Sequence, residues 1–208
     1  DGMGTTEIPI VVHIRVAGEE VWLDFAGSGP QVKGNMNNSF AGLQASVLFA
    51  LKVLIDPDGP TNHGMLEPVH ITAPEASVVN ASFPAATAAR AQTCQRIIDA
   101  ILGALAPAVP ERVIAASNGA NGVATFSGTG PDGRYYLYME TIGGGAGARS
   151  YKDGTDGIQV HVTNTSNLPV EALENEYPLL VERYELINDS GGAGTWRGGL
   201  GLRRVYRS

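Results

Sequence analysis

The stretch from Glu140 to Ala148 constrains the fold of this chain more than any other segment. It reads Glu-Thr-Ile-Gly-Gly-Gly-Ala-Gly-Ala, so four glycines occur within five residues. Glycine adopts backbone angles that other residues avoid and lets a ligand or another backbone approach closely, at a cost in stability. One apolar run, 135–139, precedes the stretch, and a second, 160–165, follows it. This pattern predicts a loop between two strands that either contacts a ligand or packs against backbone.

The composition indicates a globular chain with both helices and strands. Of the 208 residues, 43% are hydrophobic and 17% are charged, a balance typical of folded domains that bury a core. The 27 glycines are about twice the average usage, which favours long loops over a helical bundle. We predict one α+β domain over residues 1–208, with mixed, largely antiparallel sheets, two main helices and long glycine-rich loops. It resembles a piece of a longer polypeptide, since it opens inside polar loop sequence.

The charge pattern excludes several partners. The net charge is −7, and no basic cluster occurs before the C-terminal tail, so we expect no nucleic-acid binding, which requires a basic face. No apolar run approaches 18 residues, so we expect no membrane span. The single cysteine, Cys94, excludes an internal disulfide and indicates a reducing compartment, the cytoplasm.

Apolar periodicity predicts the regular elements. Cys94 lies on the apolar stripe of the second predicted helix, which favours packing over a role as a nucleophile. Asn38 or Ser39 is the expected N-cap of the first helix. The predicted helices start at Phe40, Thr87 and Pro169, and the predicted strands cover 8–16, 21–25, 68–72, 113–117, 123–126, 134–141, 179–187 and 202–206.

Glu140 and His161 border the glycine loop, each at the edge of an apolar run. If the two runs form neighbouring strands, the acid and the imidazole meet beside backbone N–H groups, an arrangement suited to acid–base catalysis with an oxyanion cradle. A structural Glu–His pair explains the same residues equally well. On the first interpretation Glu140 and His161 are catalytic, and the substrate-binding residues are Gly143, Gly144, Gly145, Gly147 and Asn164.

Asn35 and Asn37 precede the first predicted helix. A polar loop at a helix N-terminus suits a carbonyl, carboxylate or phosphate ligand, so both are further candidates for substrate binding. Capping and turn formation explain the same asparagines without a ligand.

Known devices for phosphate and metal binding are missing from the sequence. Nowhere does Gly-Lys precede a hydroxyl residue, so there is no P-loop. His63, Glu67 and His70 would share one face of a helix, but Gly64 and Pro68 oppose that helix. We therefore assign no metal ligands.

A set of short motifs runs in order over almost the whole chain. They are Asn62-x-Gly-x-x-x-Pro68, Ala73-Pro-Glu-x-Ser77, Glu140-Thr-Ile-x-Gly-Gly-Ala-Gly-Ala148, Asp153-Gly154, His161-x-Thr-Asn-Thr165, Glu171-x-x-Glu174-x-x-Tyr-Pro178, Arg183-Tyr-Glu185 and Ser190-Gly-Gly-Ala-Gly194-x-x-Arg197-Gly-Gly199-x-Gly201. Together they resemble the hydantoinase B/oxoprolinase family. The chain departs from the family at Gln159, where members often carry a second histidine.

The resemblance implies the C-terminal half of a B-type subunit. In such enzymes, which include N-methylhydantoinase, 5-oxoprolinase and the acetone and acetophenone carboxylases, an A-type, actin-like ATPase partner handles ATP. The implied divalent metal belongs to the N-terminal half of the same subunit, so no cofactor is expected on this chain.

The expected activity is therefore ATP-dependent hydrolysis of a cyclic amide, a hydantoin or 5-oxoproline, within a larger complex; the fragment alone is expected to be inactive. The alternatives are a carboxylase-type subunit acting on a ketone, and a non-catalytic scaffold for the subunit interface.

Overall fold

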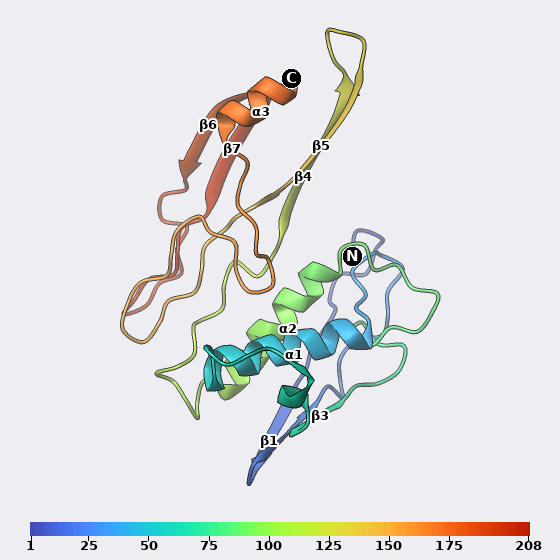
Figure 1. Ribbon diagram of the computed structural model, residues 1–208, viewed down its shortest axis with the longest axis vertical. Coiled ribbons are helices and arrows are strands. Elements are labelled where there is room, and N and C mark those ends of the chain that lie inside the picture. Colours follow the sequence, from blue (N-terminus) through green and yellow to red (C-terminus); the bar gives the residue numbers. More distant parts are fainter. The chain divides into compact units, whose positions relative to one another are not determined.

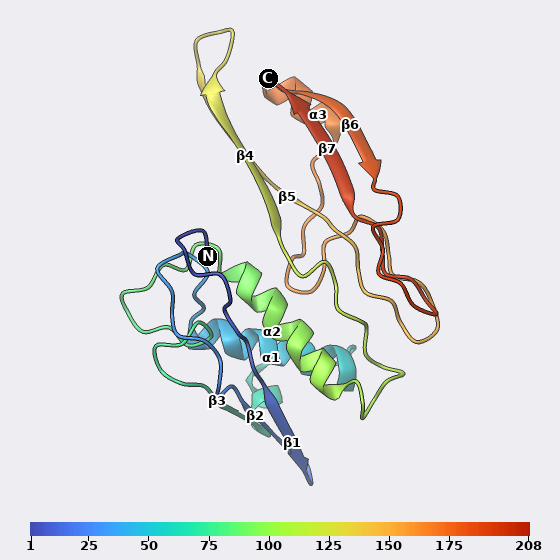
Figure 2. The same ribbon diagram turned by 180° about the vertical axis from the view of Figure 1, so that it is seen from behind.

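All residues from 1 to 208 are described by the computed structural model, and they divide into two units, 1–115 and 116–208 (Figures 1 and 2). Each unit has its own helices, strands and hydrophobic core. The α+β class is confirmed, whereas one domain over residues 1–208 stays a prediction. No helix is both long enough and apolar enough to cross a lipid bilayer.

The sheet of the first unit has the order β1-β2-β3. β1 (His13–Ala17) and β2 (Glu20–Asp24) form the predicted hairpin, and Gly18 in its turn has a φ of 61°, which glycine adopts without strain. β3 (Val69–Thr72) pairs parallel to β2. The strand ladder starts at His13 rather than at residue 8, although the apolar side chains of residues 8–12 still pack on the core.

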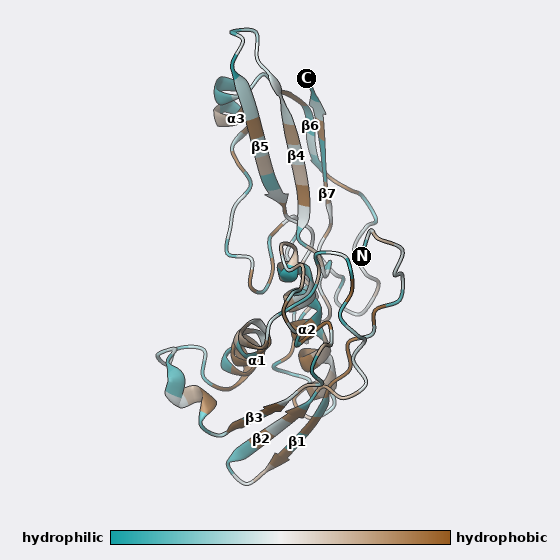
Figure 3. Cartoon of the chain, turned by 90° about the vertical axis from the view of Figure 1, so that its right-hand side faces the viewer, coloured by the Kyte–Doolittle hydropathy of each residue, from teal (hydrophilic) through white to brown (hydrophobic).

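Two helices cover this sheet, as Figure 3 shows. α1 (Phe40–Ile55) is capped by Ser39, whose hydroxyl accepts a hydrogen bond from the Gly42 N–H at 3.2 Å. α2 (Arg90–Leu105) starts three residues after the predicted Thr87, and Cys94 lies on its buried face as expected. A short 3-10 helix, η1 (His63–Leu66), precedes β3. The fully buried core side chains include Leu23, Phe25, Leu43, Val47, Ile97, Ile98 and Ile101, each contributing roughly 1.5–3 kcal/mol of burial free energy.

The second unit is built on two antiparallel strand pairs. β4 (Gly122–Thr129) and β5 (Tyr135–Ile142) form the predicted hairpin. β6 (Leu180–Leu186) pairs with β7 (Leu202–Arg207), and α3 (Val170–Glu176) lies beside β6 (Figure 1). The buried centre consists of Tyr138, Leu173 and Leu179, with aromatic side chains packed around them.

A β-bulge explains why the polar and apolar residues of β6 do not alternate regularly. Val181 pairs with Tyr206 and Arg183 pairs with Val205, so Glu182 has no partner across the ladder. The extra residue places two charged side chains in succession and bends the strand.

Two predicted strands are wrong. Residues 113–117 form no strand, and Val113 and Ile114 instead pack on the core of the first unit. Residues 160–165 form a turn and irregular backbone, and only Ile158, just before them, bridges to Gly144. Glu140 and His161 therefore do not lie on neighbouring strands.

The glycine-rich segments of the second unit lie against one another backbone to backbone. The Ala146 N–H donates to Thr155 O at 3.0 Å, the Gly199 N–H donates to Ala146 O at 2.8 Å, and the Gly154 N–H donates to Arg197 O at 2.7 Å. A side chain at Gly145 would overlap the carbonyl oxygen of Gly199. Close packing of three extended segments thus requires the glycines.

Gly145→Ala is expected to destabilise the second unit by roughly 1–3 kcal/mol, because the new methyl group meets a backbone carbonyl that cannot turn away. The urea midpoint of unfolding measures the effect. Gly192→Ala is the matched control, since nothing lies within 4 Å of a side chain there. Equal midpoints for the two variants would contradict the packing role.

Candidate functional site

Glu140 occupies the buried centre of a polar network in the second unit. Its Oε1 accepts hydrogen bonds from Arg204 at 2.6 Å and from the Leu168 N–H at 2.8 Å, and its Oε2 accepts one from the Tyr206 hydroxyl at 2.8 Å. The side chain of Glu140 is 4% exposed and that of Arg204 is 0% exposed. Both carboxylate oxygens are therefore used within the unit, and His161 is not among their partners.

The surroundings of Tyr206 keep its hydroxyl protonated. Burial, and next the hydrogen bond to the carboxylate, raise the pKa of Tyr206 well above its ordinary value of 10.0, so the hydroxyl stays a donor. The Arg204 guanidinium also donates to Leu168 O at 3.0 Å and lies 4.7 Å from the centre of the Tyr184 ring. These contacts are those of a structural ion pair that joins β5, β7 and the segment before α3. Catalysis by Glu140 stays a prediction.

Backbone groups of Gly143, Gly144 and Gly145 are hydrogen-bonded within the second unit. The Gly143 N–H donates to Asn167 Oδ1 at 3.3 Å, and the Gly144 N–H donates to Ile158 O at 3.1 Å. The carbonyl of Gly145 accepts from the Asn118 N–H at 3.0 Å, and Gly147 is buried. Substrate binding by these four glycines stays a prediction, and packing already accounts for Gly143, Gly144 and Gly145.

The two asparagine candidates of the first unit differ in their surroundings. Asn37 is fully buried, and its carboxamide hydrogen-bonds to both backbone groups of Val32 and to the carbonyls of Gly34 and Ala86. Those bonds fix the loop before α1. Asn35 is exposed, and its carbonyl accepts from the Ala89 N–H.

A pocket of about 330 Å³ lies in the second unit beside the glycine segments. It is lined by residues 157–159 and 163–167 and by Tyr184 of β6. The predicted Asn164 is one of the lining residues and is exposed. Thr163 holds the lining turn through a hydrogen bond to Asn121. This pocket brings together residues 157–159, the predicted Asn164 and a polar side chain from β6.

His161 lies in the turn between the two lining stretches, 157–159 and 163–167, and is not itself a lining residue. Its φ is 51°, in the left-handed region, which is uncommon for a residue with a side chain. Such a conformation costs on the order of 1–3 kcal/mol and recurs at functional sites. The turn is held by a hydrogen bond from the Thr163 N–H to Val160 O at 3.1 Å. The strained turn thus keeps His161 a candidate for function.

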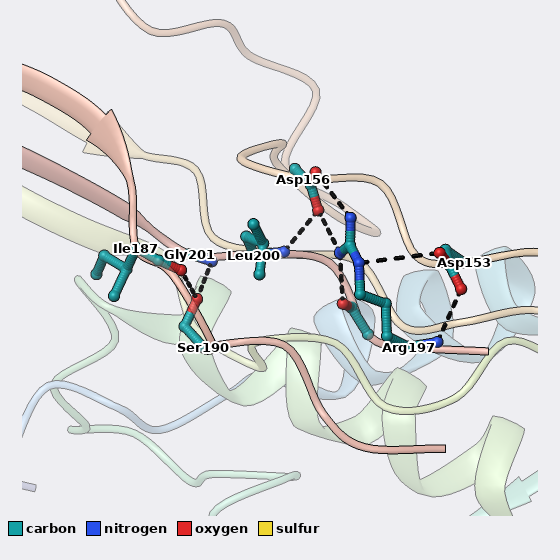
Figure 4. A network of polar contacts seen from close by, with 8 residues as sticks. Asp153, Asp156, Ile187, Ser190, Arg197, Leu200 and Gly201 are labelled. Carbon is teal, nitrogen blue, oxygen red and sulfur yellow. Dashed lines mark hydrogen bonds and ion pairs between the residues drawn. The ribbon is translucent and has the colours of Figure 1, made fainter. Parts of the chain in front are cut away.

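Two aspartates and Arg197 tie the glycine segments together, as Figure 4 shows. Arg197 donates to both oxygens of Asp156, at 2.7 and 3.1 Å, and its backbone N–H donates to Asp153 at 2.9 Å. The Leu200 N–H donates to Asp156 at 2.8 Å. The hydrogen bonds from Arg197 and then from Leu200 hold the pKa of Asp156 below its usual 3.8.

The model of one protein family matches this chain from residue 1 to residue 208, and its description is hydantoinase B/oxoprolinase. The chain belongs to this family. A protein of Methanocaldococcus jannaschii is 44% identical over 201 residues, which cover 96% of this chain and 35% of that protein. A protein of Pseudomonas sp. that is named as the B-type subunit of a D-/L-hydantoinase is 35% identical over 211 residues, covering 98% and 35%.

Solved structures also resemble the chain. The ATP-dependent caprolactamase of Pseudomonas jessenii superposes with a TM-score of 0.83 at 29% identity, over 93% of this chain and 34% of that one. A nucleotide-free acetone carboxylase superposes with a TM-score of 0.80 at 18% identity, over 94% and 27%, which shows a shared fold. This hydantoinase B/oxoprolinase chain spans about a third of the length of the first relatives it matches.

Several residues that sequence reasoning did not select contribute to the network and the pocket. Arg204 and Tyr206 donate hydrogen bonds to Glu140, and Tyr184 and Asn167 line the pocket. Tyr184 belongs to the family motif Arg183-Tyr-Glu185, which offered a signal for it. Asn167 had no such signal in the sequence, since only the fold brings it next to Tyr184. Its Nδ2 donates a hydrogen bond to the Tyr184 hydroxyl at 2.6 Å.

Glu140→Gln is expected to lower the free energy of unfolding of the second unit by about 3–5 kcal/mol, because it leaves the buried Arg204 charge without its counter-charge. Hydrogen exchange of the β5 and β7 amides measures the effect. Glu185→Gln, which breaks an exposed pair with Arg203 at 3.1 Å, should cost at most about 1 kcal/mol. Loss of turnover with unchanged protection would instead make Glu140 catalytic.

Asp156→Asn is expected to lower the urea midpoint at pH 7 and to have less effect as the pH falls from 4 to 2. The pKa of Asp156 is lower in the folded chain than its ordinary 3.8, so its ionised form stabilises the fold above that pH, and the contribution is lost as the pH falls through the folded-state pKa. Urea titrations at several pH values test this, with exposed Asp58→Asn as the control. A difference that does not change with pH would contradict it.

Proposed function

We propose that this chain is part of an ATP-dependent cyclic-amide hydrolase that opens the ring of a hydantoin or of 5-oxoproline. The observation that carries the proposal is the family match over residues 1–208. The likeness to an ATP-dependent caprolactamase supports the same reaction type, since a caprolactam is a cyclic amide. The name of the Pseudomonas relative supports a multi-subunit enzyme, in which this chain works with an A-type ATPase partner in the cytoplasm.

Neither ATP nor a metal is assigned to residues of this chain. The sequence has no P-loop, and no three His, Cys, Asp or Glu side chains converge on a point that would hold a metal ion. We place ATP on the A-type partner and the divalent metal on the N-terminal half of the same subunit.

The residues of the second unit supply binding and proton transfer in this proposal. The pocket beside the glycine segments takes the ring, with Asn164 at its wall. His161 in the strained turn moves a proton to or from the amide during ring opening, a role for which an imidazole is suited near neutral pH. The hydrogen bonds of Thr163 to Asn121 and to Val160 O hold this turn in place.

A carboxylase that acts on a ketone is the second candidate, because the acetone carboxylase shares this fold. At 18% identity that likeness supports the fold alone. The two reactions are distinguished by assaying ATP hydrolysis of the complete enzyme against hydantoins, 5-oxoproline, caprolactam and small ketones. ATP hydrolysis stimulated only by ketones would overturn the hydrolase proposal.

His161→Ala in the complete enzyme is expected to lower turnover at least about tenfold, since positioned acid–base groups contribute roughly 10²–10⁴-fold. Ring opening is followed by product formation under saturating ATP and cyclic amide. His13→Ala is the matched control, because His13 is exposed on β1.

Wild-type turnover by His161→Ala would remove the residue from the chemistry and favour a scaffolding role for the chain. Protection from hydrogen exchange then separates the two roles. A scaffold gains protection at the partner interface alone, whereas a site gains protection at residues 157–167 when the cyclic amide is added.

A further inference from the structure

One residue that lines the pocket of the second unit has a buried polar atom without a hydrogen-bond partner. Gln159 lines the pocket, and its side-chain nitrogen Nε2 is buried with no hydrogen bond from the protein. Native structures rarely leave a buried amide nitrogen unpaired, because it has lost its water and gained nothing in return. An acceptor supplied by a ligand would satisfy it.

Tyr184 adds a second donor to the same pocket. Its hydroxyl oxygen accepts from Asn167 Nδ2 at 2.6 Å, which leaves the hydroxyl proton to donate elsewhere. Asn167 is itself held by the Gly143 N–H at its Oδ1, and the Arg204 guanidinium lies 4.7 Å from the centre of the Tyr184 ring. Asn167 at the hydroxyl and Arg204 at the ring therefore fix the position of the Tyr184 side chain.

The side chains that line the pocket indicate the charge and polarity of a suitable ligand. No side chain that lines the pocket carries a charge; the polar ones are amides and hydroxyls. The pocket thus suits a neutral ligand with both donors and acceptors, and about 330 Å³ accommodates a five- to seven-membered ring.

A cyclic amide matches a carboxamide at two points. The ring forces its amide into the cis form, so the carbonyl oxygen and the N–H lie on one edge. A glutamine carboxamide presents a donor and an acceptor side by side. Rotating the carboxamide by 180° exchanges Oε1 and Nε2. A cyclic amide can bind in the correspondingly reversed orientation, so the match does not depend on how these two atoms are assigned.

We propose that Gln159 recognises the amide edge of a cyclic amide, donating from Nε2 to the ring carbonyl and accepting the ring N–H at Oε1, while the Tyr184 hydroxyl donates a further hydrogen bond to the ring. Gln159 is thus a specificity-determining residue. The assignment rests on the ring-opening function proposed above and names the part of the substrate that this pocket binds.

The test is a titration of the 208-residue chain with 2-pyrrolidone, followed by the amide chemical shifts of residues 157–167 in NMR spectra. The expected result is saturable binding that weakens at least about tenfold in Gln159→Leu and several-fold in Tyr184→Phe. Gln44→Leu, a change on α1, should bind as the wild type does. Dispersed spectra of each variant verify folding.

Two further ligands test the geometry of the match. N-methyl-2-pyrrolidone lacks the ring N–H, and N-methylacetamide holds its amide in the trans form, so both should bind at least about tenfold more weakly than 2-pyrrolidone. Equal binding of either ligand, unchanged affinity of Gln159→Leu, or no saturable binding by the wild-type chain would each overturn the proposal.

Kinetics of the complete enzyme separate this proposal from the proposed function. Gln159→Leu should raise KM for a cyclic amide at least about tenfold with a smaller change in kcat. Lactam hydrolysis with an unchanged KM would overturn the role of Gln159 and leave the function intact. Binding of 2-pyrrolidone that depends on Gln159, in an enzyme that opens no cyclic amide, would support the recognition site and overturn the function.

Discussion

Backbone-to-backbone packing of three extended segments is the constraint on which the second unit depends. The segments around Gly145, Gly154 and Gly199 approach so closely that each of these glycines faces a carbonyl oxygen of a neighbouring segment. Hydrogen bonds between the segments, and the bidentate contact of Arg197 with Asp156, hold that packing. Because glycine loses much conformational freedom on folding, a cluster of this density requires such compensation.

A second interaction, the buried Glu140–Arg204 pair, connects elements that are distant in the sequence. It joins β5 to β7 and, through Leu168, to the segment that leads into α3. A buried ion pair is stabilised by further hydrogen bonds to its polar atoms. Tyr206 and Leu168 donate to the carboxylate oxygens, whereas Arg204 Nε is buried without a partner. Each carboxylate oxygen thus accepts at least one hydrogen bond from within the second unit.

The proposed function uses a polar turn that follows the packed glycine segments. Residues 157–159 and 163–167 line a pocket with Tyr184, and the strained His161 lies between these two stretches. A rigid base beneath a strained turn is how a fold positions polar groups for a small ligand. In the proposed enzyme this turn would hold the ring, while the ATP and metal chemistry takes place on other parts of the complex.

The sequence by itself determined the class of the fold, most elements and the family. Apolar periodicity predicts the hairpins and both main helices, because an amphipathic face must point to a core wherever that core lies. Ser39 as a cap and the buried Cys94 follow from the same local rules. The ordered motifs from Asn62 to Gly201 indicate the family that the match over residues 1–208 confirms.

Only the tertiary structure decided which polar residues are occupied by the fold and which face a pocket. Glu140 and Asn37 look equally suited to a substrate in the sequence, yet both are surrounded by partners from remote segments. Gln159 stands out in the sequence only as a departure from the family motif, and the structure shows that its amide nitrogen is buried without a partner. Hydrogen-bond satisfaction depends on contacts between distant residues, and periodicity and spacing contain no information about those contacts.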